Sequence, residues 1–123
     1  MSTVRPARRP RESPESAPAL TAGARYFRVL GDPTRLQMLA ALLARERTVA
    51  DLVSIVGAPR SRISNHLACL KWCRFVTARR RGRHVVYDVA DPRIGDLLAL
   101  VKGLSDERCH HLARCGRIGP EWI

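Results

Sequence analysis

Apolar residues recur every three to four positions through most of the chain, which predicts a mainly helical domain. The pattern is clearest over residues 61–73, where Ile63, Leu67 and Leu70 fall on one stripe of a helical wheel. Small and polar residues gather on nearly the opposite side of that wheel: Ser61, Asn65, Ala68 and Trp72. This segment therefore predicts a helix with one face in the core and one polar face turned outward.

Four further helices are predicted from the same periodicity and from residues that start or stop helices. They cover about 21–30, a segment beginning at Asp32-Pro33, 49–56, and a closing segment beginning at Asp91-Pro92. In both Asp-Pro pairs the aspartate is expected to cap the helix and the proline to be its first residue. The expected core stripe of the helix after Pro33 is Leu36, Leu39, Ala40 and Leu43. The closing helix carries an apolar stripe of Ile94, Leu97, Leu98, Val101 and Leu104.

The middle of the chain predicts a helix-turn-helix followed by a hairpin. The short helix 49–56 ends at Gly57, residues 58–60 form a tight turn, and the longer helix 61–73 follows. Two β-prone runs, 75–80 and 83–89, then flank Arg81-Gly82. The expected fold class is therefore mainly α with a small β-hairpin, a winged helix-turn-helix.

Composition points to one small basic domain. The chain has 123 residues, a net charge of +11 and a pI of about 11.1, and all but two of its 22 basic residues are arginines. Residues 1–20 are expected to be a disordered basic tail, 21–108 the folded domain and 109–123 a C-terminal tail. So small a core favours a dimer, for which the closing helix offers a surface. No run is apolar enough for a membrane span or a secretory signal, so we expect a cytoplasmic protein.

The positive charge and the outward polar face together predict binding to double-stranded DNA. Ser61, Ser64 and Asn65 are expected to reach base edges or phosphates, and the arginines to hold the backbone. The hairpin tip would contact phosphate or the minor groove, the alternative being a solvated charged turn. The full predicted set is Arg60, Ser61, Arg62, Ser64, Asn65, Lys71, Arg79, Arg80, Arg81 and Arg83.

Four cysteines in a reducing compartment favour metal or redox chemistry over structural disulfides. Cys69 and Cys73 are one helical turn apart, so their sulfurs can share a soft metal ion but cannot complete its coordination shell. Cys109 and Cys115 are the remaining thiols, and spacing does not choose between them. The alternative for Cys69 and Cys73 is a pair of small buried hydrophobic side chains.

The order of these elements resembles the ArsR/SmtB family of bacterial winged-helix metal-sensing repressors. The resemblance rests on residues 30–36 (LGDPTRL), 61–67 (SRISNHL), Leu70-Lys71, and Gly82-Arg83 before 85–87 (VVY). It implies a homodimer that binds an operator with an inverted repeat and releases it when metal binds. The cysteine pair of the arsenic sensors is absent at 48–52, and the closing helix lacks the histidine of the zinc and nickel sensors at Asp96-Leu97-Leu98.

Segment 65–73 (NHLACLKWC) most resembles the CmtR type, which senses cadmium and lead through two cysteines on the recognition helix and a third beyond the closing helix. The resemblance therefore implies Cd(II) or Pb(II) as inducer, with As(III) or Zn(II) as further possibilities, and Cys69, Cys73, Cys109 and Cys115 as candidate ligands. Two alternatives remain: a repressor of the same fold that responds to As(III) or to oxidants, and a constitutive DNA-binding protein with structural cysteines. An enzyme is not expected, because the chain has no glycine-rich phosphate loop and no nucleophile paired with a base.

Overall fold

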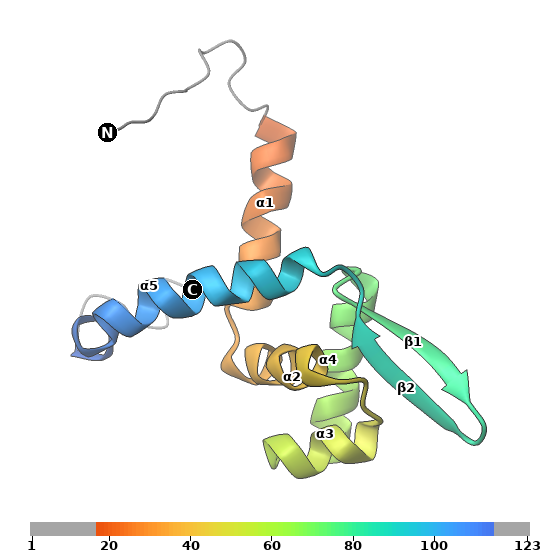
Figure 1. The fold of residues 1–123 in the computed structure, drawn as a ribbon. Coiled ribbons are helices and arrows are strands. Elements are labelled where there is room, and N and C mark those ends of the chain that lie inside the picture. The colour runs from red at the N-terminus through yellow and green to blue at the C-terminus, as the bar shows by residue number, and fades with distance from the viewer. Residues whose placement is uncertain (1–16, 115–123) are drawn as a thin grey trace.

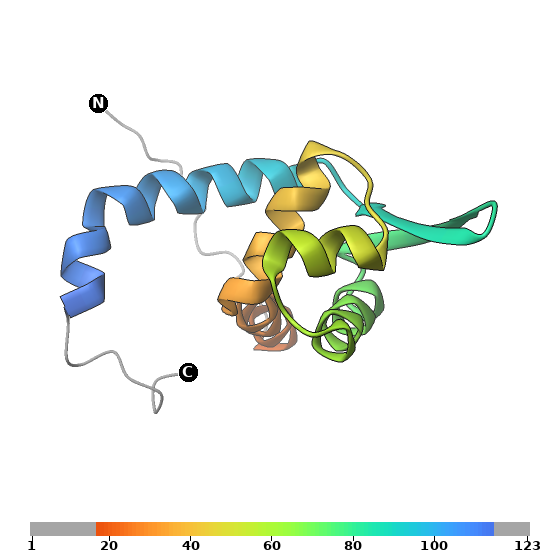
Figure 2. The ribbon, with the colours of Figure 1, turned by 90° about the horizontal axis from the view of Figure 1, so that it is seen from below.

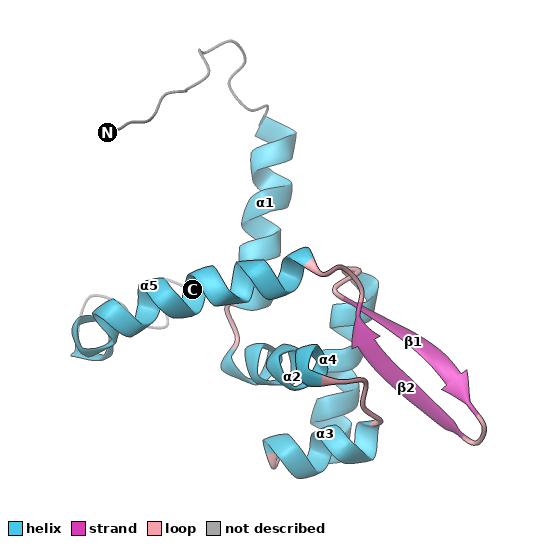
Figure 3. Ribbon diagram, viewed as in Figure 1, coloured by secondary structure: helices cyan, strands magenta, loops and turns pink. Residues whose placement is uncertain are grey.

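The computed structural model describes residues 17–114, apart from the side chains of 109–110 and 112–114. Within these residues the chain forms five helices and one antiparallel hairpin (Figure 3). In chain order the elements are α1 (Ala17–Leu30), α2 (Pro33–Ala44), α3 (Val49–Val56), α4 (Arg60–Trp72), β1 (Val76–Arg81), β2 (His84–Val89) and α5 (Arg93–Arg114). No helix in this part of the chain is both long and apolar enough to cross a membrane.

The winged helix-turn-helix is confirmed. Helix α3 lies below α2, helix α4 runs upward behind α2, and the hairpin extends from one end of the body (Figure 1). The C-terminal half of α5 extends from the opposite end, as both orientations show (Figure 2). The hairpin and the free half of α5 thus leave the body in opposite directions.

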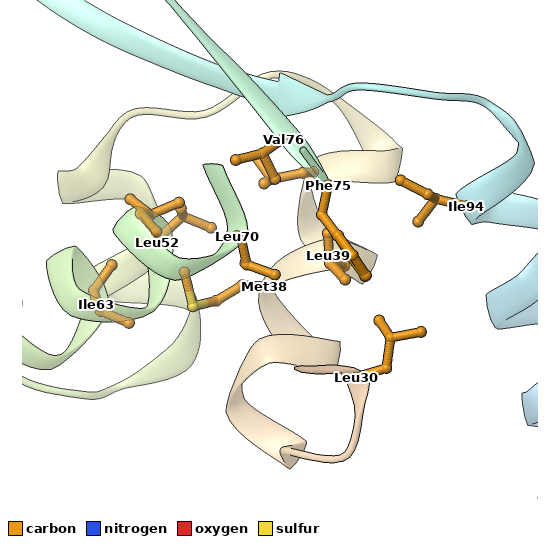
Figure 4. Close-up of a cluster of buried hydrophobic side chains, with 11 residues drawn as sticks. Leu30, Met38, Leu39, Leu52, Ile63, Leu70, Phe75, Val76 and Ile94 are labelled. Atoms are coloured by element: carbon orange, nitrogen blue, oxygen red, sulfur yellow. The ribbon is translucent and has the colours of Figure 1, made fainter. Parts of the chain in front are cut away.

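Helix α2 is central to the core, since it contacts α1, α3, α5 and β2. The buried cluster takes side chains from all five helices and from the start of the hairpin (Figure 4). Its members are Leu30, Met38, Leu39, Leu42, Leu52, Ile63, Leu67, Leu70, Phe75, Val76 and Ile94. No polar or charged residue in the described part of the chain is buried. The buried contacts of α4 are therefore apolar, and its exposed polar face is unused by the fold.

The start and end of α3 and the hairpin tip each carry a residue type that suits the local backbone conformation. Helix α3 starts with a capping box, in which the Thr48 side chain accepts from the Asp51 N–H and the Asp51 carboxylate accepts from the Thr48 N–H. It ends at Gly57, whose φ of 77° lies in the left-handed region. Gly82 at the hairpin tip has a φ of 62° for the same reason.

Helix boundaries differ from the sequence prediction at both ends. Helix α1 begins at Ala17 instead of near residue 21, because Pro18 falls in the first turn, where a missing N–H is tolerated. Helix α5 continues to Arg114 and so includes 109–114, which we had assigned to the C-terminal tail. The sequence has no glycine or proline between Gly103 and Gly116 to stop it.

The predicted core stripe of α2 is wrong in part. Met38, Leu39 and Leu42 are buried, whereas Ala40 and Leu43 are exposed. Ala40 and Leu43 instead line an apolar groove of about 460 Å³ together with residues of α5, including Leu98. The helix is apolar on two sides, and periodicity does not tell which side meets α3, α4 and the hairpin.

The expected caps at the two Asp-Pro pairs also differ. Asp32 occupies the N-cap position of α2, but its side chain makes no capping hydrogen bond. Asp91 Oδ1 accepts from the Arg93 N–H at 2.9 Å, and α5 begins at Arg93 instead of at Pro92. The bidentate contact with the Arg93 guanidinium lowers the pKa of the Asp91 carboxyl to about 2.

Candidate functional site

Helix α4 has the three faces that its sequence predicts. Ile63, Leu67 and Leu70 are buried in the core. The residues of the opposite face are all exposed: Ser61, Asn65, Ala68 and Trp72. Cys69 and Cys73 lie half-buried on the flank between those two faces. The helix therefore presents a free polar face directly beside a pair of thiols.

Every residue that we predicted to contact DNA is exposed, and the set divides into two groups. One group lies along α4: Arg60, Ser61, Arg62, Ser64, Asn65 and Lys71. The other lies on the hairpin: Arg79, Arg80, Arg81 and Arg83. The fold thus leaves both groups accessible to a ligand.

The two groups adjoin at a hollow of about 580 Å³ between α3, the start of α4 and the hairpin. Arg60 and Arg83 line this hollow with His84 and the capping box of α3. The carboxylate in this hollow is that of Asp51. It already accepts a hydrogen bond from the Thr48 N–H, which lowers the pKa of the Asp51 carboxyl. The hollow therefore offers two guanidinium groups to an anion, as a nucleic-acid backbone requires.

Trp72 extends the exposed face of α4 to its last turn. Its side chain is 86% exposed, and it lines a shallow hollow with Ala68, Lys71 and Arg74. Sequence analysis placed Trp72 on the polar face but did not count it among the DNA contacts. A large exposed aromatic residue beside two cations makes Trp72 a further candidate contact on this face.

Glu46, in the loop between α2 and α3, was not singled out by sequence analysis. Its carboxylate forms ion pairs with Arg79 at 2.5 Å and with Arg81 at 2.7 Å. Two of the four hairpin arginines are therefore already paired within the protein. The ion pairs join positions far apart in the chain, and no local spacing indicates them.

The thiols of Cys69 and Cys73 interact with each other. Burial and the adjacent Cys69, with which Cys73 shares a hydrogen bond, raise the pKa of the Cys73 thiol, and the charge of Arg35 opposes them. Cys73 therefore holds its proton at neutral pH in the metal-free protein. Metal ligation needs the thiolate, so binding here must displace a proton.

Among the residues whose side chains the structure describes, the candidate sulfur ligands are Cys69 and Cys73. In this described part of the chain, no group of three or more His, Cys, Asp or Glu side chains is arranged to hold a metal ion. The backbone of Cys109 lies in α5, but its side chain is outside the described part of the molecule, and Cys115 lies wholly outside it. The predicted third ligand stays a prediction.

Asp32, Arg35 and His66 join the start of α2 to the thiol-bearing flank of α4. Arg35 donates through Nε to His66 Nδ1 at 3.2 Å and through Nη1 to the Val29 carbonyl at 3.1 Å. Asp32 Oδ2 lies 3.5 Å from His66 Nε2 and accepts no hydrogen bond. Because Nδ1 of His66 is an acceptor here, His66 is engaged within the fold and is not free to bind a metal through that atom.

Helices α1 and α5 carry an apolar surface that the single chain leaves uncovered. Phe27 is 66% exposed and Leu104 is 60% exposed, and each is one of several such residues on its helix. The exposed set on these helices is Leu20, Tyr26, Phe27, Leu100, Val101 and Leu104. A surface of this kind typically marks a protein–protein interface.

Comparison with known proteins agrees with this arrangement. The sequence profile described as "Bacterial regulatory protein, arsR family" matches residues 32–78. The "Probable mercury resistance operon repressor" of Streptomyces lividans is 45% identical over 98 residues, which are 80% of this chain and 78% of that protein. The "HTH-type transcriptional regulator CmtR" of Mycobacterium tuberculosis is 40% identical over 91 residues, 70% of this chain and 77% of that protein.

Solved structures give the same result for the fold. The crystal structure of Rv0081 from M. tuberculosis superposes with a TM-score of 0.72 at 32% identity, covering 80% of this chain and 99% of that one. The solution structure of Mb0332 from Mycobacterium bovis superposes with a TM-score of 0.70 at 32% identity, covering 84% and 95%. That domain is described as a homodimeric winged helix-turn-helix DNA-binding domain.

Proposed function

The chain belongs to the arsR family of bacterial regulatory proteins, and from this we propose a repressor that binds an operator as a homodimer and releases it when a thiophilic metal ion binds the α4 thiols. Membership makes it a transcriptional regulator and not an enzyme. The observation that carries the metal-dependent part is the contact between Cys69 and Cys73 on the flank of the helix whose exposed face would meet DNA.

DNA binding is assigned to the exposed face of α4 and to the hairpin. Helix α4 enters the major groove, where Ser61, Ser64 and Asn65 face base edges. Arg60, Arg62 and Lys71 contact phosphates on either side of the groove, and the hairpin contacts the backbone beside it. The support is the joint exposure of these residues and the shared hollow of Arg60 and Arg83.

A homodimer through α1 and α5 is proposed from the apolar side chains that these helices expose. Two-fold symmetry would set two α4 helices in successive major grooves about 34–36 Å apart. The operator would then be an inverted repeat, because each half-site meets the same face of α4. The homodimeric description of the Mb0332 domain supports this assembly.

The donor set fits a soft metal ion in part. Cys69 and Cys73 provide two sulfurs one helical turn apart, and thiolates select soft metals over Mg(II) or Ca(II). We assign the remaining ligand to Cys109 or Cys115, from the same or the partner chain. A bound ion would supply a bond between the α4 thiolates and that C-terminal sulfur.

Release follows from the position of the thiols on α4. Cys69 is one residue from Ala68, which lies on the exposed face. A movement of α4 that brings the thiols to a metal ion therefore also moves that face. By linkage, metal and DNA must weaken each other's binding by the same factor. In this proposal the metal ion and the DNA bind the same helix.

Cd(II) and Pb(II) are the inducers that the CmtR-like cysteine pair favours. Hg(II) is a second candidate, because the Streptomyces relative is named for mercury resistance and two thiolates are a suitable donor set for so soft an ion. A response to As(III) or Zn(II), or to oxidation of the two thiols, would keep the same fold and change the signal.

An ultraviolet absorbance titration of the reduced, metal-free protein tests the metal site. Cd(II), Pb(II), Hg(II), As(III) and Zn(II) are added separately, and sulfur-to-metal charge-transfer bands are recorded. The proposal expects a band that saturates at one ion per chain and is lost in Cys73→Ser. The matched variants Cys109→Ser and Cys115→Ser identify the third ligand. A band of equal size in Cys73→Ser would show that the metal ion does not bind at the α4 thiols.

A further inference from the structure

The hairpin carries four arginines: Arg79, Arg80 and Arg81 on β1, which the strand pairing assigns to faces, and Arg83 in the turn. Residues that pair directly across antiparallel strands place their side chains on the same face. Arg79 pairs with Val86, and Arg80 pairs with Val85. Because side chains alternate along a strand, Arg79 and Arg81 share one face of the hairpin and Arg80 lies on the other.

Glu46 belongs to the face of Arg79 and Arg81. Its neighbour Arg47 forms an isolated antiparallel bridge with Tyr87, with N–H···O distances of 3.0 and 2.8 Å. Arg47 therefore lies on the Tyr87 face, and Glu46, one residue earlier, lies on the opposite face with Val86. Val86 is buried there, and the Glu46 side chain is only 24% exposed against 57% for Arg79.

Two residues of the other face of the hairpin, Val85 and Tyr87, lie near the start of α4. They line the hollow that Arg60 and Arg83 also line, together with His84 from the Arg81 face. Arg80 shares the face of Val85 through their direct pairing. No acidic side chain of the described residues forms an ion pair with Arg80 or Arg83. Their charges are therefore unpaired within the described part of the chain, and Arg83 lies beside Arg60 at the start of α4.

We propose that Glu46 is a positioning residue for DNA binding: it holds Arg79 and Arg81 as a brace between the hairpin and the α2–α3 loop, and leaves Arg80 and Arg83 to contact DNA phosphates. The inference rests on the proposed DNA binding and deepens it. With Glu46 between them, the Arg79 and Arg81 guanidiniums form a group of net charge +1, and the carboxylate repels a phosphate that approaches it. Arg79 and Arg81, which we predicted from sequence to bind DNA, act in this proposal through the hairpin's orientation.

The first test measures how DNA affinity depends on salt, because each phosphate contact contributes about −0.9 to the slope of log K against log salt. In a homodimer each substitution removes two phosphate contacts, so Arg80→Ala and Arg83→Ala should each reduce the loss of affinity over a fourfold rise in salt by about twelvefold. Arg79→Ala and Arg81→Ala, their matched controls, should leave the slope unchanged. Equal slopes in all four variants would overturn the division.

Glu46→Gln should act in the opposite direction. It releases two arginines in each protomer, four in the dimer, so the slope steepens by up to about 3.6 and the preference for operator over random duplex falls. Glu107→Gln is the charge-matched control, because Glu107 lies on α5 and, among the described side chains, its ion-pair partner is its neighbour Arg108. A slope in Glu46→Gln no steeper than in Glu107→Gln would contradict the proposal.

Hydrogen exchange of the free protein separates this inference from the proposed function. The amides of Arg47 and Tyr87 bond to each other's carbonyls, and they should exchange about two- to fivefold faster in Glu46→Gln for each ion pair lost. Arg80→Ala should leave them unchanged. If exchange is unchanged in Glu46→Gln, Glu46 does not stabilise the hairpin, whether or not the protein binds DNA. Failure of the wild-type protein to bind any duplex would instead remove the proposed function.

Discussion

Arg35 donates a hydrogen bond through Nε to His66 Nδ1 at 3.2 Å and so joins the start of α2 to the middle of α4. The same guanidinium bonds the Val29 carbonyl near the end of α1, and its charge acts on the Cys73 thiol. Arg35 is thus linked to α1, to α4 and to the candidate metal site. His66 lies on the same flank of α4 as the thiols, but its role in this arrangement is structural.

His66→Ala should lower the free energy of unfolding by about 1 kcal/mol, because it leaves the half-buried Arg35 Nε without its acceptor. Urea unfolding of the metal-free protein measures this change. His66→Gln, which keeps a side-chain acceptor, should lose less. The metal charge-transfer bands should persist in both variants, and their loss in a stably folded His66→Ala would make His66 a ligand.

Metal affinity should rise with pH. Burial and Cys69 raise the pKa of the Cys73 thiol, so the thiol is protonated at neutral pH and must lose its proton when metal binds. Affinity should increase by about tenfold per pH unit for each thiol that loses a proton, over roughly pH 6 to 9. Competition with a chelator of known pH dependence measures this. An affinity independent of pH would mean that the thiols are not the ligands.

Phe27→Glu and Leu104→Glu should convert the dimer to monomers and weaken operator binding. Each places a charge in the apolar surface of α1 and α5 that we assign to the dimer interface. Ile55→Glu is the control, because Ile55 is a partly exposed apolar residue of α3, away from that surface. Sedimentation velocity gives the oligomeric state. If the dimer persists in Phe27→Glu and Leu104→Glu but dissociates in Ile55→Glu, the interface lies on α3 instead.

Trp72 should report DNA binding through its fluorescence. It is 86% exposed in the free protein and continues the face of Ser61, Asn65 and Ala68. In a Trp122→Phe background Trp72 is the sole tryptophan, and operator DNA should quench and shift its emission. Metal that releases the DNA should restore the original spectrum. If the emission of Trp72 does not change at saturating DNA, the last turn of α4 does not contact DNA.

The parts of the fold that depend on local pattern were predictable. The three faces of α4 follow from the 3.6-residue period, and the capping box of Thr48 and Asp51 follows from their spacing. The buried stripe of α2 was not predictable. A helix with apolar residues on two sides has no unique inward face until its neighbours are placed. Leu43 was assigned to the core for this reason, and it lines the groove beside α5.

The parts of the site that depend on distant residues were not predictable. Glu46 and Arg81 are brought together only by the pairing of Arg47 with Tyr87, which no residue type signals. Asp32 was expected to cap α2, but its carboxylate faces His66. The cysteine pair, in contrast, was recognisable because Cys69 and Cys73 lie on one helix, where sequence spacing fixes their separation.

The most direct test of the account adds metal to the protein–DNA complex. A duplex selected from a random library by the metal-free protein is labelled, and its fluorescence anisotropy is followed as Cd(II), Pb(II) or Hg(II) is added to the wild-type protein and to Cys73→Ser. The account predicts that at one equivalent per chain the wild-type affinity for DNA falls roughly 5- to 150-fold, whereas Cys73→Ser stays bound. Equal release of both proteins, or retention of the wild type with every ion, would contradict it.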